Sequence, residues 1–169
     1  LLGLGAAGEV GHHSIDLHGW PDGTGNPGGW EAYASGPAIA AMGIKAVTQG
    51  LTTHIRDLAG GDLNRISPEL IKQAAEAGDG VAQGILDQAG VYLGCGLANL
   101  VIILCPHKVV IGGGLMGLGD WIMDPIWRTL RARCHTVPLD KLEIVPAALG
   151  GDAGCLGAAV WAMQQGRAV

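Results

Sequence analysis

The sequence has little charge and no cluster of positive charge. Only 15% of its 169 residues are charged, and the formal net charge is −5. Because nucleic acids bind to clustered basic surfaces, this balance argues against a nucleic-acid partner for this chain. Nearly half of the residues are hydrophobic, which excludes a disordered chain and suits one sizeable core, or a large domain with a fragment of another. The densest basic group is expected on the solvated face of one helix and consists of Arg128, Arg131 and Arg133.

Closely spaced cysteines, a signal peptide and a long unbroken apolar run are also lacking. The apolar stretch 91–105 is interrupted by Gly94, Gly96 and Asn99, so no membrane span is expected. The chain begins at Leu1 without Met, as a segment of a longer protein would, and without the basic leader of a signal peptide. We expect buried, reduced thiols in a cytoplasmic protein at all four cysteines, Cys95, Cys105, Cys134 and Cys155.

Strand-like and helical segments alternate along the chain. Ser67 and Pro68 mark a helix start, because serine caps the first amides and proline suits the first turn. The β-branched run 108–111 is typical of a buried parallel strand. The expected elements are a half-buried strand at 13–17, a turn-rich loop at 19–29, a helical region at 31–59 broken near residues 35–37, helices at 68–77 and 80–104, a strand at 108–111, a helix at 120–134, a strand at 142–147 and a helix at 153–165. This order predicts an α/β fold with a largely parallel sheet flanked by helices.

Small residues recur along the predicted helix 80–104. They would let another backbone approach closely, either within the fold or between subunits. These residues are Gly90, Gly94, Gly96 and Ala98.

Two carboxylates and an imidazole lie in turn-rich segments near the N-terminus. Glu9 and His12 belong to the segment 8–12, and Glu31 follows the glycine-rich loop. A carboxylate accepts two hydroxyl hydrogen bonds, and a neutral imidazole donates one and accepts another, so these groups suit a polyhydroxylated ligand. On spacing alone, the alternative interpretation is a helix cap, a solvated charge and a hydrogen-bonded turn histidine.

This segment resembles the signature of the ROK family of sugar kinases and sugar-responsive repressors. The signature is G-E-x-G-H followed by C-x-C-G-x-x-G-C-x-E-A-x-x-S-G. The matching residues are Glu9, His12, Gly25, Gly28, Glu31, Ala32, Ser35 and Gly36. In that family the positions of Glu9, His12 and Glu31 contact sugar hydroxyls, so the resemblance implies the same roles here.

The three cysteines of the signature are missing from this chain. Their positions hold Asp22, Thr24 and Gly29, whereas in the family these cysteines and the histidine hold a structural zinc. Zinc needs about four ligands, and threonine and glycine do not supply them, so we predict no zinc. The loop would then be held by its turns and by packing of Trp20 and Trp30, and His12 would lack its usual second partner.

Three glycines, Gly112, Gly113 and Gly114, follow the predicted strand 108–111. Glycines at such a position let backbone amides face a phosphate, although a plain tight turn has the same pattern. Within the ROK resemblance they correspond to the loop that lies against ATP, so they are the expected cofactor-binding residues. Residues 152–159 also match the closing helix of the family.

The resemblance implies an actin-like ATPase (ribonuclease H-like) fold, of which this chain is the C-terminal portion. Residues 1–36 would form the sugar-site segment and residues 37–169 the helical and α/β nucleotide side. The N-terminal domain would lie outside this chain and would supply the catalytic aspartate, since no motif here matches it.

The function expected from the resemblance is ATP-dependent phosphorylation of a hexose, with Mg²⁺ accompanying ATP. Glucose is the first candidate substrate, and an N-acetylhexosamine is the alternative. Because ROK proteins are commonly dimers or tetramers, a cytoplasmic homo-oligomer without membrane attachment is expected. The alternative functions are a sugar-responsive transcriptional repressor and a non-catalytic sugar-binding relative.

Overall fold

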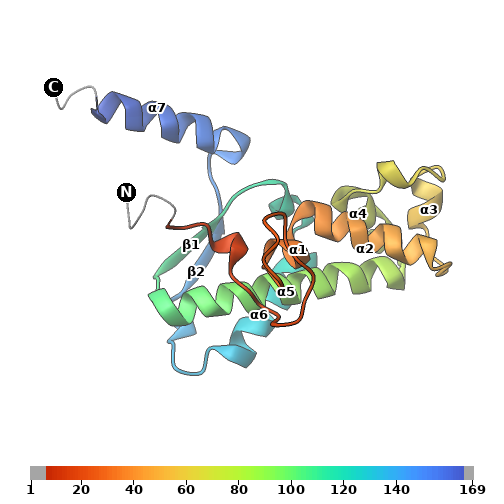
Figure 1. Cartoon of the computed structure of the whole chain (residues 1–169), viewed down its shortest axis with the longest axis horizontal. Coiled ribbons are helices and arrows are strands. Elements are labelled where there is room, and N and C mark those ends of the chain that lie inside the picture. Colours follow the sequence, from red (N-terminus) through yellow and green to blue (C-terminus); the bar gives the residue numbers. More distant parts are fainter. Residues whose placement is uncertain (1–6, 166–169) are drawn as a thin grey trace.

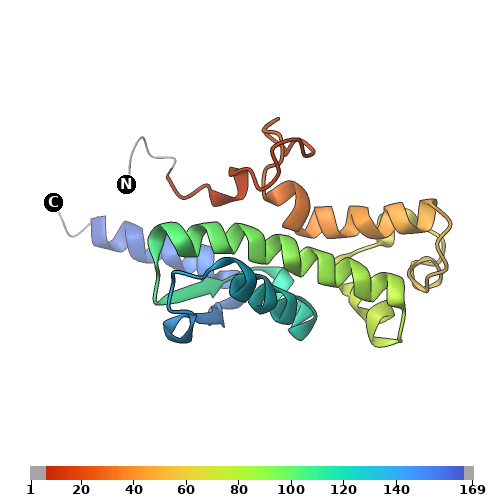
Figure 2. The ribbon, with the colours of Figure 1, turned by 90° about the horizontal axis from the view of Figure 1, so that it is seen from below.

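One long helix, α5, runs through the part of the chain that the computed structural model describes, residues 7–165 (Figure 1). The helices and strands are α1 (Glu31–Ala34), α2 (Gly36–Thr48), α3 (Ile55–Leu58), α4 (Pro68–Glu76), α5 (Gly80–Leu104), β1 (Lys108–Ile111), α6 (Asp120–Arg133), β2 (Glu143–Pro146) and α7 (Ala153–Gln165). Figure 2 shows α2 on one side of α5 and α6 on the other. The predicted helices at 68–77, 80–104, 120–134 and 153–165 are confirmed to within one residue at each end.

Helix caps explain where several of these helices begin. Ser67 accepts a hydrogen bond from the amide of Leu70 at the start of α4, as predicted. The predicted break near residue 35 is confirmed, because Ser35 caps α2 in an extended conformation. The cap of α5 was not predicted: the buried carboxylate of Asp79 accepts from the first amides of the helix.

The helices α5 and α6 lie against each other along glycines. Gly90 faces Pro125, and a Cβ added at Gly94 would lie 2.7 Å from the Cβ of Thr129. Further along, the thiol of Cys134 lies 3.9 Å from the carbonyl oxygen of Ala98. The predicted close approach is therefore confirmed, and it occurs within the fold.

The sheet is a parallel pair of strands, β1 and β2, joined through α6. Lys108 pairs with Glu143, and Ile111 pairs with Pro146. The parallel direction was predicted correctly, but the prediction of a buried strand is wrong, because Val110 is 58% exposed. Only the alternate residues of β1, such as Val109, pack on the core formed by α5 and α6, so the other face of the pair remains uncovered in the described chain.

Two groups of buried side chains form the core. The first joins α2, α3, α4, the N-terminal half of α5 and the start of α6, with Ile39, Ile71 and Leu86 fully buried. The second joins the C-terminal half of α5 to α6 and the sheet. Cys134 belongs to the second group as expected, but Cys105 and Cys155 are exposed, which corrects the prediction that all four thiols are buried.

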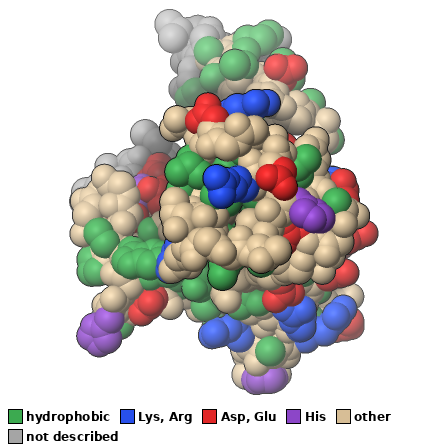
Figure 3. Space-filling model, turned by 90° about the vertical axis from the view of Figure 1, so that its right-hand side faces the viewer, with side chains coloured by type: hydrophobic (Ala, Val, Ile, Leu, Met, Phe, Trp, Pro, Cys, Tyr) green, Lys and Arg blue, Asp and Glu red, His purple; other side chains and the backbone are tan. Residues whose placement is uncertain are grey.

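By length and composition, α5 is the one described helix that could cross a membrane. It has buried residues along most of its length and contacts α1, α2, α4 and α6, which is the position of a core helix. The predicted basic group on α6 is exposed, and Arg128 pairs with Asp87 of α5. On the face in Figure 3, Lys and Arg side chains alternate with Asp and Glu, and no continuous basic patch forms there.

Candidate sugar site

The loop between His13 and Glu31 folds back on itself. Ser14 forms an antiparallel bridge with Gly29, and Pro21 forms another with Pro27. The predicted half-buried strand at 13–17 is reduced to the first of these bridges, because a turn begins at Asp16, whose carbonyl accepts from the amide of Gly19. The prediction of an ordered, turn-rich loop at 19–29 is confirmed.

Two tryptophans connect this loop to the helices. The indole N–H of Trp30 donates to the carbonyl of Tyr92 in α5 at 2.8 Å. Trp20 stacks on Tyr33 with a ring separation of 5.9 Å, although 60% of Trp20 is exposed. The expected role of both residues in holding the loop is confirmed, with Trp30 as the anchor to the core.

The carboxylate of Asp22 lies at the centre of the loop, and its side chain is fully buried. Its Oδ1 accepts from the amide and the hydroxyl of Thr24, at 2.9 and 2.7 Å, and from the amide of Asn26 at 3.0 Å. Its Oδ2 lies 2.9 Å from Nδ1 of His12. Hydrogen bonds from Thr24 and His12 hold the pKa of Asp22 far below its usual value against the opposing effect of burial.

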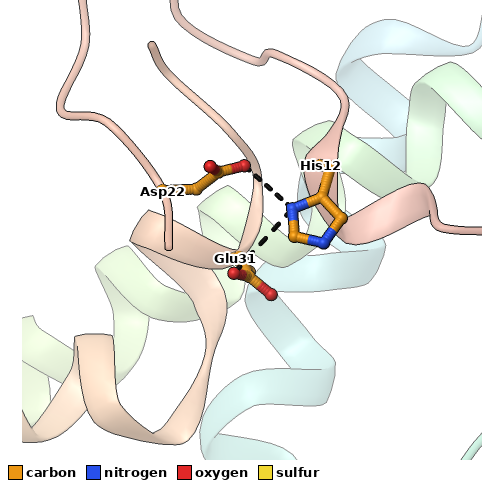
Figure 4. A group of neighbouring side chains, drawn as sticks. All are labelled: His12, Asp22 and Glu31. Atoms are coloured by element: carbon orange, nitrogen blue, oxygen red, sulfur yellow. Dashed lines mark hydrogen bonds and ion pairs between the residues drawn. The ribbon is translucent and has the colours of Figure 1, made fainter. Parts of the chain in front are cut away.

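His12 and Glu31, two of the three predicted sugar-binding residues, lie side by side (Figure 4). His12 ends the short 3-10 turn 10–12, and Glu31 is the first residue of α1. Nδ1 of His12 is 3.9 Å from Oε1 of Glu31, and both side chains are partly exposed. The hydrogen bond with Asp22 and the negative charge of Glu31 raise the pKa of His12, while partial desolvation opposes this.

Glu9, the third predicted residue, lies outside this cluster. It is exposed at the start of the 3-10 turn, and its carboxylate acts on His12 only through its charge, which contributes to the raised pKa of His12. The structure thus brings His12 and Glu31 together and adds Asp22. Asp22 was considered only as a zinc ligand from the sequence. The run Asp22–Gly23–Thr24 is typical of a turn in which an aspartate accepts from the residue two positions on, and this signal identifies its structural role.

A pocket of about 450 Å³ lies beside this cluster. Such a volume lies within the usual range for small-ligand sites. Its lining combines a carboxylate, a hydroxyl and an indole, which are groups that hydrogen-bond and stack on sugars. The lining includes Trp20, Asp22, Glu31, Ser35 and Pro37.

Of the three glycines after β1, Gly114 lines a second pocket of about 390 Å³, whereas Gly112 lines a different pocket beside Val109. The first residues of α2 and α4, including Ser67, line the second pocket together with Gly114. Pro37 lines both this second pocket and the first, so the two are neighbours. Amides at helix starts and in glycine loops favour anions. Glu69 also lines this pocket, so a phosphate there would face one carboxylate.

The helices packed around α5 and the parallel pair of β1 and β2 form a portion of an actin-like fold. The chain belongs to the ROK family, whose family model matches residues 3–165.

Several characterised proteins are similar to this chain. The glucokinase of Halalkalibacterium halodurans is 34% identical over 165 residues, which cover 95% of this chain and 48% of that protein. The xylose repressor of Caldicellulosiruptor bescii is 31% identical over 153 residues, covering 90% of this chain and 38% of the repressor. The crystal structure of a ROK family glucokinase from Streptomyces griseus in complex with glucose and AMPPNP superposes with a TM-score of 0.81 at 31% identity, covering 94% of this chain and 52% of that one. The chain thus spans about half the length of the glucokinases it matches.

Proposed function

We propose that the protein containing this chain phosphorylates a hexose with ATP, and that Glu9, His12 and Glu31 hold the sugar. The observation that carries the proposal is the pair of His12 and Glu31, 3.9 Å apart, beside a pocket of about 450 Å³. Oε1 of Glu31 is too far from His12 for a hydrogen bond, so its lone pairs remain for ligand hydroxyls. Glu9 is included because of its place in the ROK signature, three residues before His12.

The nucleotide side of the proposal rests on Gly112, Gly113 and Gly114. Their loop adjoins the second pocket, and ATP bound there would direct its phosphates towards the neighbouring sugar pocket. The glucokinase of Streptomyces griseus, a similar protein, was crystallised with glucose and AMPPNP, which supports ATP as donor and glucose as the first candidate substrate. Mg²⁺ would accompany ATP and offset the charge of Glu69 near the phosphates.

The catalytic aspartate belongs, in this proposal, to an N-terminal domain outside this chain. Residues 1–36 then form the sugar-site segment of a C-terminal part, and residues 37–169 form its nucleotide side. Phosphoryl transfer depends mainly on positioning and on neutralising the transferred group, so a site shared between two domains suits the reaction. We also propose that the protein is a cytoplasmic homo-oligomer, a dimer or a tetramer.

A sugar-responsive repressor is the second candidate, and the similarity to a xylose repressor favours it. Such a protein would use the same sugar pocket without phosphoryl transfer. The full-length sequence discriminates between the two, since a DNA-binding helix-turn-helix before this chain indicates a repressor and a phosphate-binding D-x-G-x-T segment indicates a kinase.

The test is ADP release by the full-length protein with Mg-ATP and a set of sugars: glucose, mannose, fructose, N-acetylglucosamine and N-acetylmannosamine. We expect turnover with glucose, and a preference for an acetylated sugar would identify the alternative substrate. A folded protein that releases no ADP with any sugar would refute the kinase proposal.

Glu31→Gln tests the sugar site in the same assay. We expect kcat/KM for the sugar to fall roughly 10- to 100-fold, because a charged acceptor for a sugar hydroxyl is lost. The matched control is Glu76→Gln, an exposed glutamate at the end of α4, which should leave kcat/KM unchanged. Equal kinetics for both variants would remove Glu31 from the site.

A further inference from the structure

We infer that the carboxylate of Asp22 replaces the zinc of the ROK signature, closing the loop 20–29 and positioning His12 without a metal. Its part in sugar binding rests on the proposed function, whereas its part in the loop does not. Asp22 is thus a positioning residue that acts through His12.

The hydrogen bonds of Asp22 account for the closed loop. Its Oδ1 accepts two hydrogen bonds from Thr24 and one from Asn26, and its Oδ2 lies within hydrogen-bond distance of Nδ1 of His12. A structural zinc joins distant parts of a loop in the same way, by drawing several ligands to one centre. Here a buried anion draws donors instead, so both oxygens of Asp22 are engaged.

The same contact determines which ring nitrogen of His12 carries the proton. An ionised carboxylate only accepts hydrogen bonds, so Nδ1 of His12 must donate to Oδ2 of Asp22. In neutral His12 the other nitrogen, Nε2, is then an acceptor, and it can receive a hydrogen bond from a ligand hydroxyl. Asp22 is thus the partner of His12 in the position where the family has the metal.

The residues at the three cysteine positions are complementary to one another. Asp22 accepts, and Thr24 donates to it. Gly29 leaves room, because a Cβ at this position would lie 2.8 Å from both the Cβ and the Cγ of Asp22 and closer still to its Oδ2. Gly29 is not among the glycines with positive φ, so the lack of space for a side chain is the constraint at this position. A cysteine at 29 is thus incompatible with the aspartate at 22.

The residues at and around the zinc positions of the signature do not suit zinc. His12, Asp22 and Glu31 offer three ligand atoms within 4.8 Å of one another, but Thr24 and Gly29 add no thiolate or imidazole. Two ligands of a tetrahedral zinc at about 2.0–2.1 Å lie roughly 3.3 Å apart. The 2.9 Å between His12 and Asp22 is shorter than this and is the length of a hydrogen bond.

The first experiment measures metal content and thermal unfolding of the full-length protein, purified without chelator in zinc-containing buffer. We expect well under one zinc per chain and the same unfolding temperature with and without EDTA. One zinc per chain, with a fall in unfolding temperature on chelation, would overturn the inference.

Substitutions at positions 29 and 22 test whether the side chain of Asp22 fills the space beside Gly29. Gly29→Cys should lower the unfolding temperature of the wild type by several degrees, and it should cost less when added to Asp22→Cys, in which the clash is already absent. The triple variant Asp22→Cys, Thr24→Cys, Gly29→Cys should bind one zinc per chain. A Gly29→Cys protein as stable as the wild type would show that Asp22 does not occupy this space.

The second experiment assigns the protonated nitrogen of His12 by ¹⁵N NMR at a pH where the ring is neutral. The wild type should carry the proton on Nδ1, and a proton on Nε2 would overturn the inference without any variant. In Asp22→Asn the amide can donate to Nδ1, so the proton should move to Nε2. Thr24→Val is the control, because it removes one donor to Asp22 and leaves its contact with His12.

Steady-state kinetics test whether the tautomer of His12 affects sugar binding. Asp22→Asn should raise KM for the sugar about tenfold with little change in KM for ATP, whereas Thr24→Val should lower stability and leave both values unchanged. Equal sugar KM for Asp22→Asn and the wild type would overturn the positioning role. If the protein phosphorylates no sugar, the proposed function fails, while the zinc and NMR measurements still decide whether Asp22 replaces the metal.

Discussion

At the residue scale, Asp22 is a buried charge that the fold stabilises with four donors. A buried carboxylate without partners is costly, and removing its donors would leave an uncompensated charge. Its donors come from Thr24 and Asn26 in its own turn and from His12 in the preceding 3-10 turn. The stability of the loop 20–29 therefore depends on Asp22 remaining ionised.

This dependence predicts a loss of stability in acid. The pKa of Asp22 in the folded protein lies below its value in the unfolded chain, about 3.9. Its contribution is therefore complete above that unfolded pKa and is lost progressively as the pH falls below it. Urea unfolding between pH 6 and pH 2.5 measures the slope, which should be smaller in Asp22→Asn. Parallel curves for the two proteins would contradict the prediction.

At the scale of elements, one face of α5 is adapted to close packing and another is not. Gly94 lies against Thr129 and Ile126 of α6, whereas a Cβ at Gly84 would meet nothing within 4 Å. Both glycines lie inside the same helix, so they share the same helix propensity. The difference between them is therefore a difference of packing.

Alanine at these two positions should change stability in opposite directions. Gly84→Ala should stabilise the protein by roughly 0.5–1 kcal/mol, because alanine loses less conformational freedom in a helix. Gly94→Ala gains the same propensity but forces α5 and α6 apart, and overpacking costs typically 1–3 kcal/mol. Thermal and urea unfolding of the two variants show whether each gains or loses stability relative to the wild type. A stabilised Gly94→Ala protein would show that the helices have room between them.

Asp79 connects the start of α5 to the segment before α3. Its Oδ1 accepts from the amides of Val81 and Ala82, and its Oδ2 accepts from the hydroxyl of Thr53 and the amide of His54. Burial opposes ionisation, but these hydrogen bonds together lower the pKa of Asp79. One side chain thus caps a helix and holds a loop.

Asp79→Ala should therefore cost more than loss of an ordinary cap. A helix cap contributes typically about 1 kcal/mol, and the partly buried donors of Thr53 and His54 lose their acceptor as well, so we expect a loss of roughly 2–3 kcal/mol. The control is Asp62→Ala, which removes an exposed cap of the 3-10 turn 63–65 and should cost less than about 1 kcal/mol. Chemical denaturation compares the two variants. Similar losses of stability for both would refute the proposal that Asp79 holds the loop as well as capping the helix.

At the scale of the whole molecule, apolar side chains are buried in some parts of the described chain and exposed in others. Its two core groups share α5, but apolar side chains remain exposed at the end of α5 and along α7, such as Ile103 and Trp161. Figure 1 shows α7 extending away from the other helices. Cys134 is inside the second core group, where burial raises the pKa of its thiol, whereas Cys105 is exposed just after α5.

Thiol labelling should separate these two cysteines. Cys105 should react with a thiol reagent in the folded protein, while Cys134 should react at least about a thousandfold more slowly, because its exposure requires the core to open. Variants that retain one cysteine each assign the rates, and addition of urea should abolish the difference. Fast labelling of Cys134 in the native protein would show that the second core group opens locally.

The sequence by itself determined the order of helices and strands from α4 onward, the cap at Ser67, the break before α2 and the register of the ROK signature. These features depend on caps, prolines and periodic apolar residues, which act over a few neighbouring positions. Only the tertiary structure decided that Asp22 and Gly29 share one space, that His12 has a partner, and that Val110 and Cys105 are exposed. Burial and hydrogen bonding at these positions depend on how the loop folds back on itself and on which faces of the helices and strands are covered, and the spacing of residues along the chain does not record either.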